Sequence, residues 1–250
     1  MADPRFFLAA DAALLDRALE TGDEVVLSDR ASHHAMRALR LRNGEAVTIF
    51  CGTGREWRGT IRFDAKAGYV ALTSAADPQN ESPVRMTLVQ ALVAPEKLDW
   101  IVEKAVETGV SEIVLTPAAR SVTKLSGERL EKRLQKLRDI AVSAAEQCGR
   151  NVVPEIRAVS SAAKAFADIK ADVRLLLAPG SETPASVRKG VRSAAFAVGP
   201  EGGFSPEEMA AGVDAGWDPV LLGPRVLRTE TAGIAAAVWL NTIAGDYPGN

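Results

Sequence analysis

The stretch Ala195-Phe196-Ala197-Val198-Gly199-Pro200-Glu201-Gly202-Gly203-Phe204-Ser205-Pro206-Glu207-Glu208 decides the fold class of this chain. Its first four residues form an apolar run typical of a buried strand. Ser205 is a favourable N-cap, Pro206 suits the first helical turn, and Glu208 completes a capping box. The glycine loop therefore connects a strand to a helix at the carboxyl end of that strand, where open α/β sheets bind ligands. A tight turn without a ligand is the alternative interpretation.

The same alternation of strand and helix recurs C-terminal to residue 83. The expected strands are short apolar runs at residues 88–93, 113–115, 175–177, 195–198 and 220–222. One helix is expected to begin at Pro95 and end at Gly109, and a second to end near Cys148-Gly149. A last helix covers roughly residues 230–243, with Thr229 as its cap. This order predicts a parallel sheet covered by helices.

The first part of the chain has a different pattern. Short apolar runs that indicate strands lie at residues 6–8, 25–27, 47–50 and 69–72. Residues 57–63 alternate between apolar and polar side chains, which predicts a strand with Arg58 and Arg62 on one face. The polar, proline-bounded stretch 77–83 indicates a linker. We therefore expect a small β-barrel over residues 1–76 and an α/β domain over residues 84–250.

Composition restricts the class of protein. The chain has 250 residues, of which 47% are hydrophobic and 25% charged, as in soluble globular proteins. No apolar stretch has membrane-spanning length, and the N-terminus lacks the layout of a signal peptide. The two cysteines, Cys51 and Cys148, lie far apart and indicate neither a disulfide framework nor a cysteine zinc site. We expect a cytoplasmic protein.

Positive charge is concentrated in one segment although the net charge is only −2. Between residues 30 and 66, eight basic residues face three acidic ones, so this segment carries a charge of +5. The basic residues are Arg30, Arg37, Arg40, Arg42, Arg55, Arg58, Arg62 and Lys66. The segment indicates either a phosphate-binding face or a solvated basic surface.

A second glycine loop lies near the C-terminus. Gly223-Pro224-Arg225-Val226-Leu227-Arg228 follows a predicted strand and precedes the last helix. Its two arginines suit recognition of phosphate or carboxylate, although structural ion pairs would explain them equally well. A third such loop, residues 179–183, follows Leu177. Loops at the carboxyl ends of neighbouring strands can surround one ligand, so we expect a small-molecule pocket here.

Several common sites are excluded by the sequence. It contains neither a Gly-x-Gly-x-x-Gly loop after a strand nor a phosphate-binding loop ending in Gly-Lys-Ser/Thr. The only histidines, His33 and His34, are adjacent, so we expect no metal site and no histidine-based triad. Any chemistry is expected to come from the reactivity of a bound cofactor.

The two C-terminal loops together closely resemble the RsmE family, the 16S rRNA uridine N3-methyltransferases of the SPOUT superfamily. The residues concerned are Gly199–Gly203 and Leu222–Ala232. The similarity extends to Glu146-Gln147-Cys148-Gly149-Arg150, to residues 103–110 and to residues 34–40. It therefore spans nearly the whole chain.

This resemblance implies a SPOUT domain with a trefoil knot, whose loops bind S-adenosylmethionine in a bent conformation. It also implies a homodimer with an N-terminal PUA-like barrel that contacts RNA. The substrate would be a uridine in the decoding region of 16S rRNA, methylated at N3 within the assembled small subunit. The resemblance implies neither a bound metal ion nor an association with a membrane. A non-catalytic rRNA-binding assembly factor and a methyltransferase for another RNA position are the alternatives.

The resemblance also implies roles for individual residues. The cofactor would contact Leu177, Pro179, Gly199, Pro200, Glu201, Gly202, Gly203, Leu222, Gly223, Val226, Leu227, Thr229, Thr231 and Ala232. The candidate catalytic residues are Glu201, Arg225, Arg228 and Glu230, and the candidate RNA-binding residues are Arg5, His34, Arg37, Arg40, Arg58, Arg62 and Arg150. Two questions stay open at this point. One is which group deals with the uracil N3 proton. The other is whether Glu146, Gln147 and Arg150 serve RNA, the knot or the dimer interface.

Overall fold

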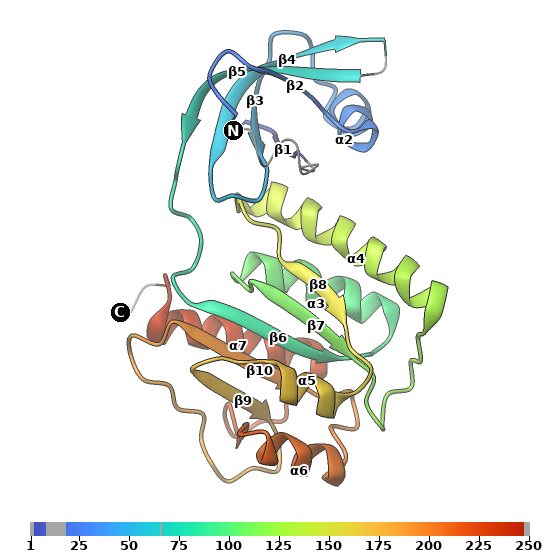
Figure 1. Ribbon diagram of the computed structural model, residues 1–250, viewed down its shortest axis with the longest axis vertical. Helices are drawn as coiled ribbons and strands as arrows, with labels where there is room; N and C mark the ends of the chain where they lie inside the picture. Colours follow the sequence, from blue (N-terminus) through green and yellow to red (C-terminus); the bar gives the residue numbers. More distant parts are fainter. Residues whose placement is uncertain (1–2, 9–18, 66, 248–250) are drawn as a thin grey trace. The chain divides into compact units, whose positions relative to one another are not determined.

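The computed structural model describes residues 3–8, 19–65 and 67–247, so Lys66 of the basic segment lies outside the described residues. The chain divides into two compact units (Figure 1). The first contains Met1–Glu81 together with Ala145–Val153, and the second contains Ser82–Ala144 and Pro154–Asn250. Among the described residues, no helix has the length and apolar character needed to cross a lipid bilayer.

The second unit is built on a six-stranded sheet in which every pairing is parallel. Its strands are β6 (Arg85–Ala91), β7 (Glu112–Thr116), β8 (Glu155–Ala158), β9 (Val173–Leu177), β10 (Ser193–Val198) and β11 (Asp218–Val220). Their order across the sheet is β11-β9-β10-β6-β7-β8. The predicted α/β class is confirmed, although the polar strand β8 was not expected from the sequence.

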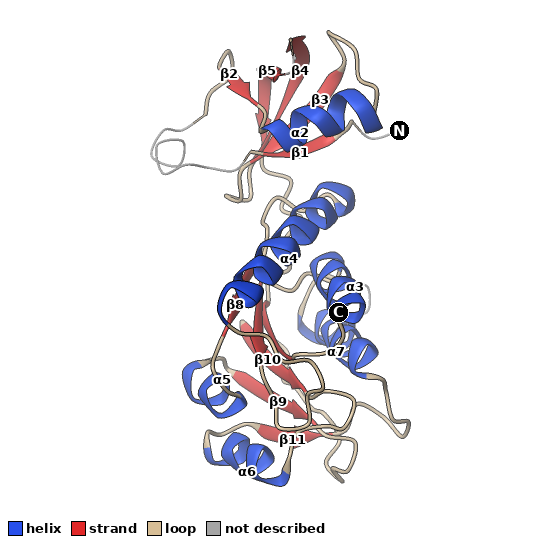
Figure 2. Ribbon diagram, turned by 90° about the vertical axis from the view of Figure 1, so that its right-hand side faces the viewer, coloured by secondary structure: helices blue, strands red, loops and turns tan. Residues whose placement is uncertain are grey.

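Helices cover both faces of this sheet (Figure 2). They are α3 (Pro95–Glu107), α4 (Gly127–Cys148), α5 (Ala162–Asp168), α6 (Pro206–Asp214) and α7 (Thr229–Ala244). Helices α3 and α7 lie on one face, where Gly233 of α7 approaches Leu88 and Val198. Helices α5 and α6 lie on the other, where Phe166 and Trp217 join a core with Val89. Burial on both faces explains why the central strands are continuous apolar runs.

The start of α6 follows the sequence prediction. The Ser205 hydroxyl accepts a hydrogen bond from the Glu208 N–H at 3.2 Å, and the Glu208 carboxylate accepts one from the Ser205 N–H at 2.8 Å. The predicted cap of α7 is wrong by one residue. Arg228 is the N-cap and makes no side-chain cap bond, whereas Thr229 is already helical. The Thr229 hydroxyl is committed to a different contact.

The order of the strands places a crevice. From β6, the next strands in sequence, β7 and β8, are added on one side, whereas β9, β10 and β11 lie on the other side. The strand order therefore reverses between the neighbours β6 and β10. The chain continues from β6 into α3 on one face and from β10 into α6 on the other. Connections that diverge from adjacent parallel strands leave room for a ligand at the carboxyl ends of those strands.

The first unit is a five-stranded sheet with a helical cover. Its strands are β1 (Arg5–Phe7), β2 (Glu24–Val26), β3 (Ala46–Phe50), β4 (Glu56–Asp64) and β5 (Ala67–Ala76). They lie in the order β1-β3-β4-β5-β2, and all pairings are antiparallel except β1 with β3. Over the described residues, β1 and β2 are the edges of this sheet, so the strand pairing does not close the expected barrel.

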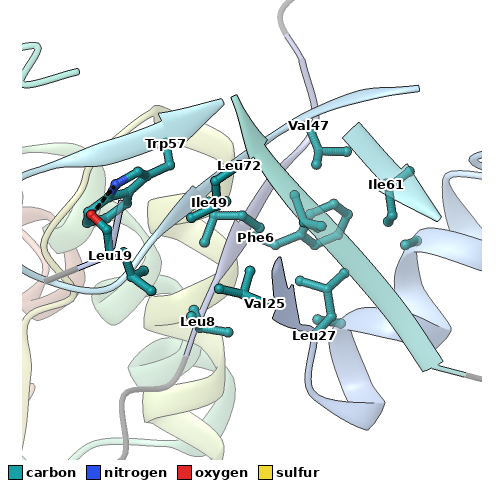
Figure 3. Close-up of a cluster of buried hydrophobic side chains, with 13 residues drawn as sticks. Phe6, Leu8, Leu19, Val25, Leu27, Val47, Ile49, Trp57, Ile61 and Leu72 are labelled. Carbon is teal, nitrogen blue, oxygen red and sulfur yellow. Dashed lines mark hydrogen bonds between the residues drawn. The ribbon is translucent and has the colours of Figure 1, made fainter. Parts of the chain in front are cut away.

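The inner face of this sheet forms a compact core (Figure 3). It contains Phe6, Ile49 and Ile61, and the Trp57 indole N–H donates to the Leu19 carbonyl at 3.2 Å. Helix α2 (Asp29–His33) continues into a single π-helical stretch, η1 (His34–Ala38), and together they contribute Ala31 and Ala35 to the same core. The helical segment therefore covers the inner face of the sheet.

Strand β4 shows the predicted alternation. Trp57 and Ile61 are buried, whereas Arg58 and Arg62 are exposed on the opposite, outer face. Arg62 is not a free cation there. It forms a two-point ion pair with Glu24, at 2.7 and 2.8 Å, and its guanidinium lies 4.2 Å from the centre of the Tyr69 ring.

Residues 145–153 complete the first unit through polar contacts. The Glu146 carboxylate accepts a hydrogen bond from the Phe7 N–H at 3.0 Å, and burial raises the pKa of this carboxyl. The Arg150 side chain is only 7% exposed and donates twice to Glu81, at 2.7 and 2.9 Å. Both residues therefore have structural partners in this unit, a role that the sequence interpretation did not include.

A second polar cluster connects strand β1 to residues 145–153. Arg5 donates to the Glu56 carboxylate at 2.7 Å and to the Asn151 side-chain oxygen. Asn151 is fully buried and donates in turn to the Gly54 carbonyl at 3.1 Å. The Arg5 guanidinium also lies 5.2 Å from the centre of the Phe50 ring. Its two terminal guanidinium nitrogens thus donate within the protein.

Candidate functional site

A cavity of about 330 Å³ opens at the carboxyl ends of the strands in the second unit. It is lined by Lys97, Leu177, Pro179, Val198, Gly199, Pro200, Glu201, Gly203, Val226, Leu227, Arg228, Thr229, Glu230 and Ala232. This volume falls within the range of small-molecule sites. The cavity lies where the reversal of strand order predicts a crevice, between the connections that follow β6 and β10.

A smaller hollow of about 50 Å³ adjoins the cavity and shares Leu177, Pro179, Leu227 and Ala232 with it. Most of its remaining lining is apolar, from the end of β11 and the loop that follows. Arg225 is the exception and lies at this hollow rather than at the larger cavity. The two together offer an apolar recess beside a polar chamber.

The structure brings most of the predicted cofactor residues together. Eleven of the fourteen line the cavity or the hollow, and Gly202, Gly223 and Thr231 do not. A side chain at Gly202 would point at the Arg120 methylenes, 3.3 Å from its Cδ, instead of into the cavity. Three of the four predicted catalytic residues, namely Glu201, Arg228 and Glu230, line the larger cavity.

Buried hydrogen bonds connect the two glycine loops to the sheet. The Thr229 hydroxyl donates to the Gly199 carbonyl at 2.7 Å and accepts from the Gln90 side-chain amide at 3.0 Å. Gln90 is fully buried on β6 and also donates to the Ala91 carbonyl at 3.1 Å. A Cβ at Gly199 would lie 2.7 Å from the Phe204 nitrogen, so only glycine allows this close turn. The contacts fix the loop after β10 against the start of α7.

A lysine that the sequence interpretation missed lies at the centre of the charged lining. The Lys97 ammonium is 2.7 Å from Glu201 Oε1 and 3.5 Å from Glu230 Oε2. Its hydrogen bond to Glu201 raises the pKa of Lys97 and lowers that of Glu201. Both groups therefore stay charged at neutral pH.

A signal for Lys97 was present in the sequence. It lies just after the predicted strand 88–93, hence at the same sheet edge as the glycine loops. A single sequence does not show that β6 and β10 are neighbours in the sheet. The contact between Lys97 and Glu201 could therefore not be predicted. Four apolar lining residues were missed because they lie in or next to strand ends that were treated as core, namely Ala178, Val198, Val220 and Leu221.

The loop after β7 supports the glycine loop from outside the cavity. Arg120 donates to the Gly202 carbonyl at 2.7 Å. The Ala119 N–H donates to the Glu208 carboxylate at 2.8 Å, the same carboxylate that caps α6. The motif loop is therefore held on one side by Thr229 and on the other by Arg120.

The predicted RNA-binding residues fall into separate groups. Arg5 and Arg150 are engaged inside the first unit, as described above. Arg58 and Arg62 lie on the outer face of the sheet. His34, Arg37 and Arg40 are exposed on and after η1, which covers the inner face. The basic segment thus presents two surfaces, one on each side of the sheet.

No group of three or more His, Cys, Asp or Glu side chains among the described residues is arranged to hold a metal ion. The two histidines are exposed neighbours in the helical segment of the first unit.

Comparison with known proteins now identifies the chain. A family model described as an RNA methyltransferase domain matches residues 80–241, and one described as an RNA methyltransferase PUA domain matches residues 21–67. The ribosomal RNA small subunit methyltransferase E of Mycobacterium bovis is 33% identical over 231 residues, which cover 89% of this chain and 87% of that protein. The chain belongs to the ribosomal RNA small subunit methyltransferase E family. The resemblance drawn from the motifs is confirmed.

Solved structures of similar proteins agree with this assignment. A small subunit methyltransferase E from Neisseria gonorrhoeae, bound to S-adenosyl methionine, is 30% identical with a TM-score of 0.88 and covers 98% of this chain and 100% of its own. A Legionella pneumophila protein in complex with the cofactor SAM is 31% identical with a TM-score of 0.90, covering 99% and 100%. The Bacillus subtilis member of the family is 29% identical over 228 residues, 86% of each chain.

The contacts of Thr229 generate a test of how the methyltransferase E site is held. We expect Thr229→Val to destabilise the protein by about 1–3 kcal/mol, because it leaves the Gln90 amide and the Gly199 carbonyl short of a buried partner. Urea unfolding measures this change. Thr231→Val is the matched control, since Thr231 is exposed two residues later on α7. Equal stabilities of the two variants would show that the buried hydrogen bonds contribute nothing.

Proposed function

We propose that this chain transfers a methyl group from S-adenosylmethionine to N3 of a uridine in 16S rRNA, acting on the assembled small ribosomal subunit. The observation that carries the proposal is the cavity lined by the two motif loops, which follow β10 and β11, and by the end of β9. Family membership supports the enzyme class, and the cavity supplies the place for the reaction. A non-catalytic assembly factor would not need the charged groups that line it.

The lining of the cavity suits the cofactor. The adjoining hollow is mostly apolar, as an adenine ring requires, and backbone groups of the glycine loop border the cavity. Glu201 and Glu230 are matched by Lys97 and Arg228, so the four charged residues that line the cavity have no net charge. The two carboxylates are nevertheless local partners of the sign that a sulfonium cation requires. We infer that Leu177, Leu222, Leu227 and Ala232 contact the adenosine part.

The chemistry needs alignment and the removal of one proton. The cofactor supplies the methyl group: the N3 lone pair forms the new N–C bond, the C–S bond breaks, and its electron pair stays on sulfur. Uracil N3 carries a proton that a positioned base must take. Of the described lining residues, Glu201 and Glu230 are the carboxylates available for this task. Arg228 lines the same cavity and would stabilise the negative charge that develops on the uracil oxygens.

The proposal includes a trefoil knot and a homodimer, as in the SPOUT superfamily. After β11, at the edge of the sheet, the chain returns along the cavity to α7, which packs on the central strands β6 and β10. Such a return past strand ends supports a knotted path. Self-association is supported by two large exposed apolar side chains, Trp100 on α3 and Val238 on α7.

The cavity can be filled without disturbing the backbone. We expect Ala232→Leu to abolish measurable binding of S-adenosylmethionine in calorimetry, because Ala232 lines both the cavity and the hollow. Leucine is a good helix former, so α7 should stay intact. Thr231→Leu, which adds a similar side chain outside the cavity, should bind normally. Loss of binding in both variants, or in neither, would contradict the placement of the cofactor.

The two basic surfaces can be separated by mutation. We expect the Arg37→Ala, Arg40→Ala pair to weaken RNA binding more than the Arg58→Ala, Arg62→Ala pair, because Glu24 already neutralises Arg62. Each lost phosphate contact should reduce the slope of log affinity against log salt by about 1. Filter binding across a salt series measures both effects. If neither pair changes the slope, the basic segment is only a solvated surface.

The substrate is tested by methyl transfer from radiolabelled cofactor. We expect efficient transfer to small subunits lacking the modification and poor transfer to a short naked RNA of the same sequence, because a chain that carries a PUA domain in addition to a catalytic unit can read RNA shape. Mass spectrometry of the product should place the methyl group on uracil N3. Equal rates on both substrates would contradict recognition of the assembled particle, and modification at another atom would contradict the assigned chemistry.

A further inference from the structure

Lys97 occupies an unfavourable position for a lysine. It is the third residue of α3, after Ala94 as N-cap and Pro95 as the first helical residue. The N-terminal end of a helix carries partial positive charge, which disfavours cations and favours residues such as the preceding Glu96. The helix itself therefore gains nothing from Lys97. An explanation has to come from what its ammonium contacts.

The ammonium joins groups from three separate elements. Lys97 follows β6, Glu201 follows β10, and Glu230 is in the first turn of α7. All three side chains line the cavity, and Lys97 is 2.7 Å from Glu201 and 3.5 Å from Glu230. Both carboxylates approach the same nitrogen and are thus close enough to repel each other in its absence. No other lysine lines the cavity among the described residues.

We propose that Lys97 is a positioning residue of the transfer site, which keeps Glu201 ionised and fixes Glu201 and Glu230 in place beside the bound cofactor and uracil. The inference rests on the proposed function, since it assigns the cavity to methyl transfer. The carboxylate that takes the N3 proton must be deprotonated before the uridine arrives. Lys97 favours that state and also prevents the two carboxylates from separating.

The direction of the pH effect follows from the contacts. In the wild type, Lys97 lowers the pKa of Glu201, so this carboxylate stays charged as the pH falls into the mildly acidic range. Without the ammonium that lowering is lost and repulsion by Glu230 is no longer compensated, so the pKa of Glu201 rises. Protonation then begins at a higher pH. A variant without this cation should lose activity and cofactor affinity earlier on acidification than the wild type.

The test uses Lys97→Met, which keeps most of the aliphatic stem and removes the charge. We expect a loss of at least about tenfold in transfer rate on small subunits. The acid limb of the pH–rate profile should shift to higher pH. Calorimetric affinity for S-adenosylmethionine should be similar at about pH 7.5 and about pH 5.5 for the wild type and should fall several-fold over that interval for the variant. Lys97→Arg should restore the wild-type acid limb and its affinity at the lower pH.

Lys104→Met is the matched control from the same helix. Lys104 also bridges two carboxylates, those of Glu103 and Glu107, each at 2.7 Å, and these contacts raise its pKa to about 12. It does not line the cavity, so its removal should leave the pH profile and the cofactor affinity unchanged.

Each outcome bears on one hypothesis. A Lys97→Met protein with the wild-type acid limb and pH-independent affinity would overturn the role of Lys97. The same holds if Lys104→Met shifts both equally. If Lys97→Met does not fold, Lys97→Gln provides the uncharged variant, with the same expected shift. A wild-type protein that binds no S-adenosylmethionine would instead overturn the proposed function itself.

Discussion

Strands β6 and β10 lie side by side, yet the chain leaves them toward opposite faces of the sheet. Every feature of the site depends on this divergence. It opens the space at the strand ends, and it brings the start of α3 next to a loop that follows a hundred residues later. The short connections after β6 and β10 then need only a few side chains to make a charged chamber.

The motif residues serve the architecture as much as any ligand. Thr229 and Gly199 are joined by a buried hydrogen bond, and Gln90 extends this link to the central strand. On the far side, Arg120 holds the Gly202 carbonyl. Pre-organised loops lose little conformational freedom when a ligand binds, and this favours both affinity and alignment. The loops of this site are therefore held in position without a ligand.

The sequence predicted well those features that depend on residues close together along the chain. Apolar runs and the capping box at Ser205 located strands and helix starts because those signals depend on neighbouring residues. Strand order does not, so the partnership of Lys97 with Glu201 could not be foreseen. The same limit applies to Arg5 and Arg150, whose charge indicated RNA contact, although in the structure Arg5 is paired with Glu56 and Arg150 with Glu81. Whether an arginine is free depends on distant parts of the chain.

Residues 145–153 belong to the first unit although they lie in the middle of the sequence of the second. They supply the carboxylate that receives the Phe7 N–H and the buried amide that meets Arg5. Neither unit is therefore a continuous segment, and the chain crosses from one to the other three times. A recombination event at the proline-bounded linker would separate the first unit from residues 145–153, which are part of its own interior. Evolution of this chain by exchange of whole N-terminal modules is accordingly disfavoured, and the two halves are expected to change together.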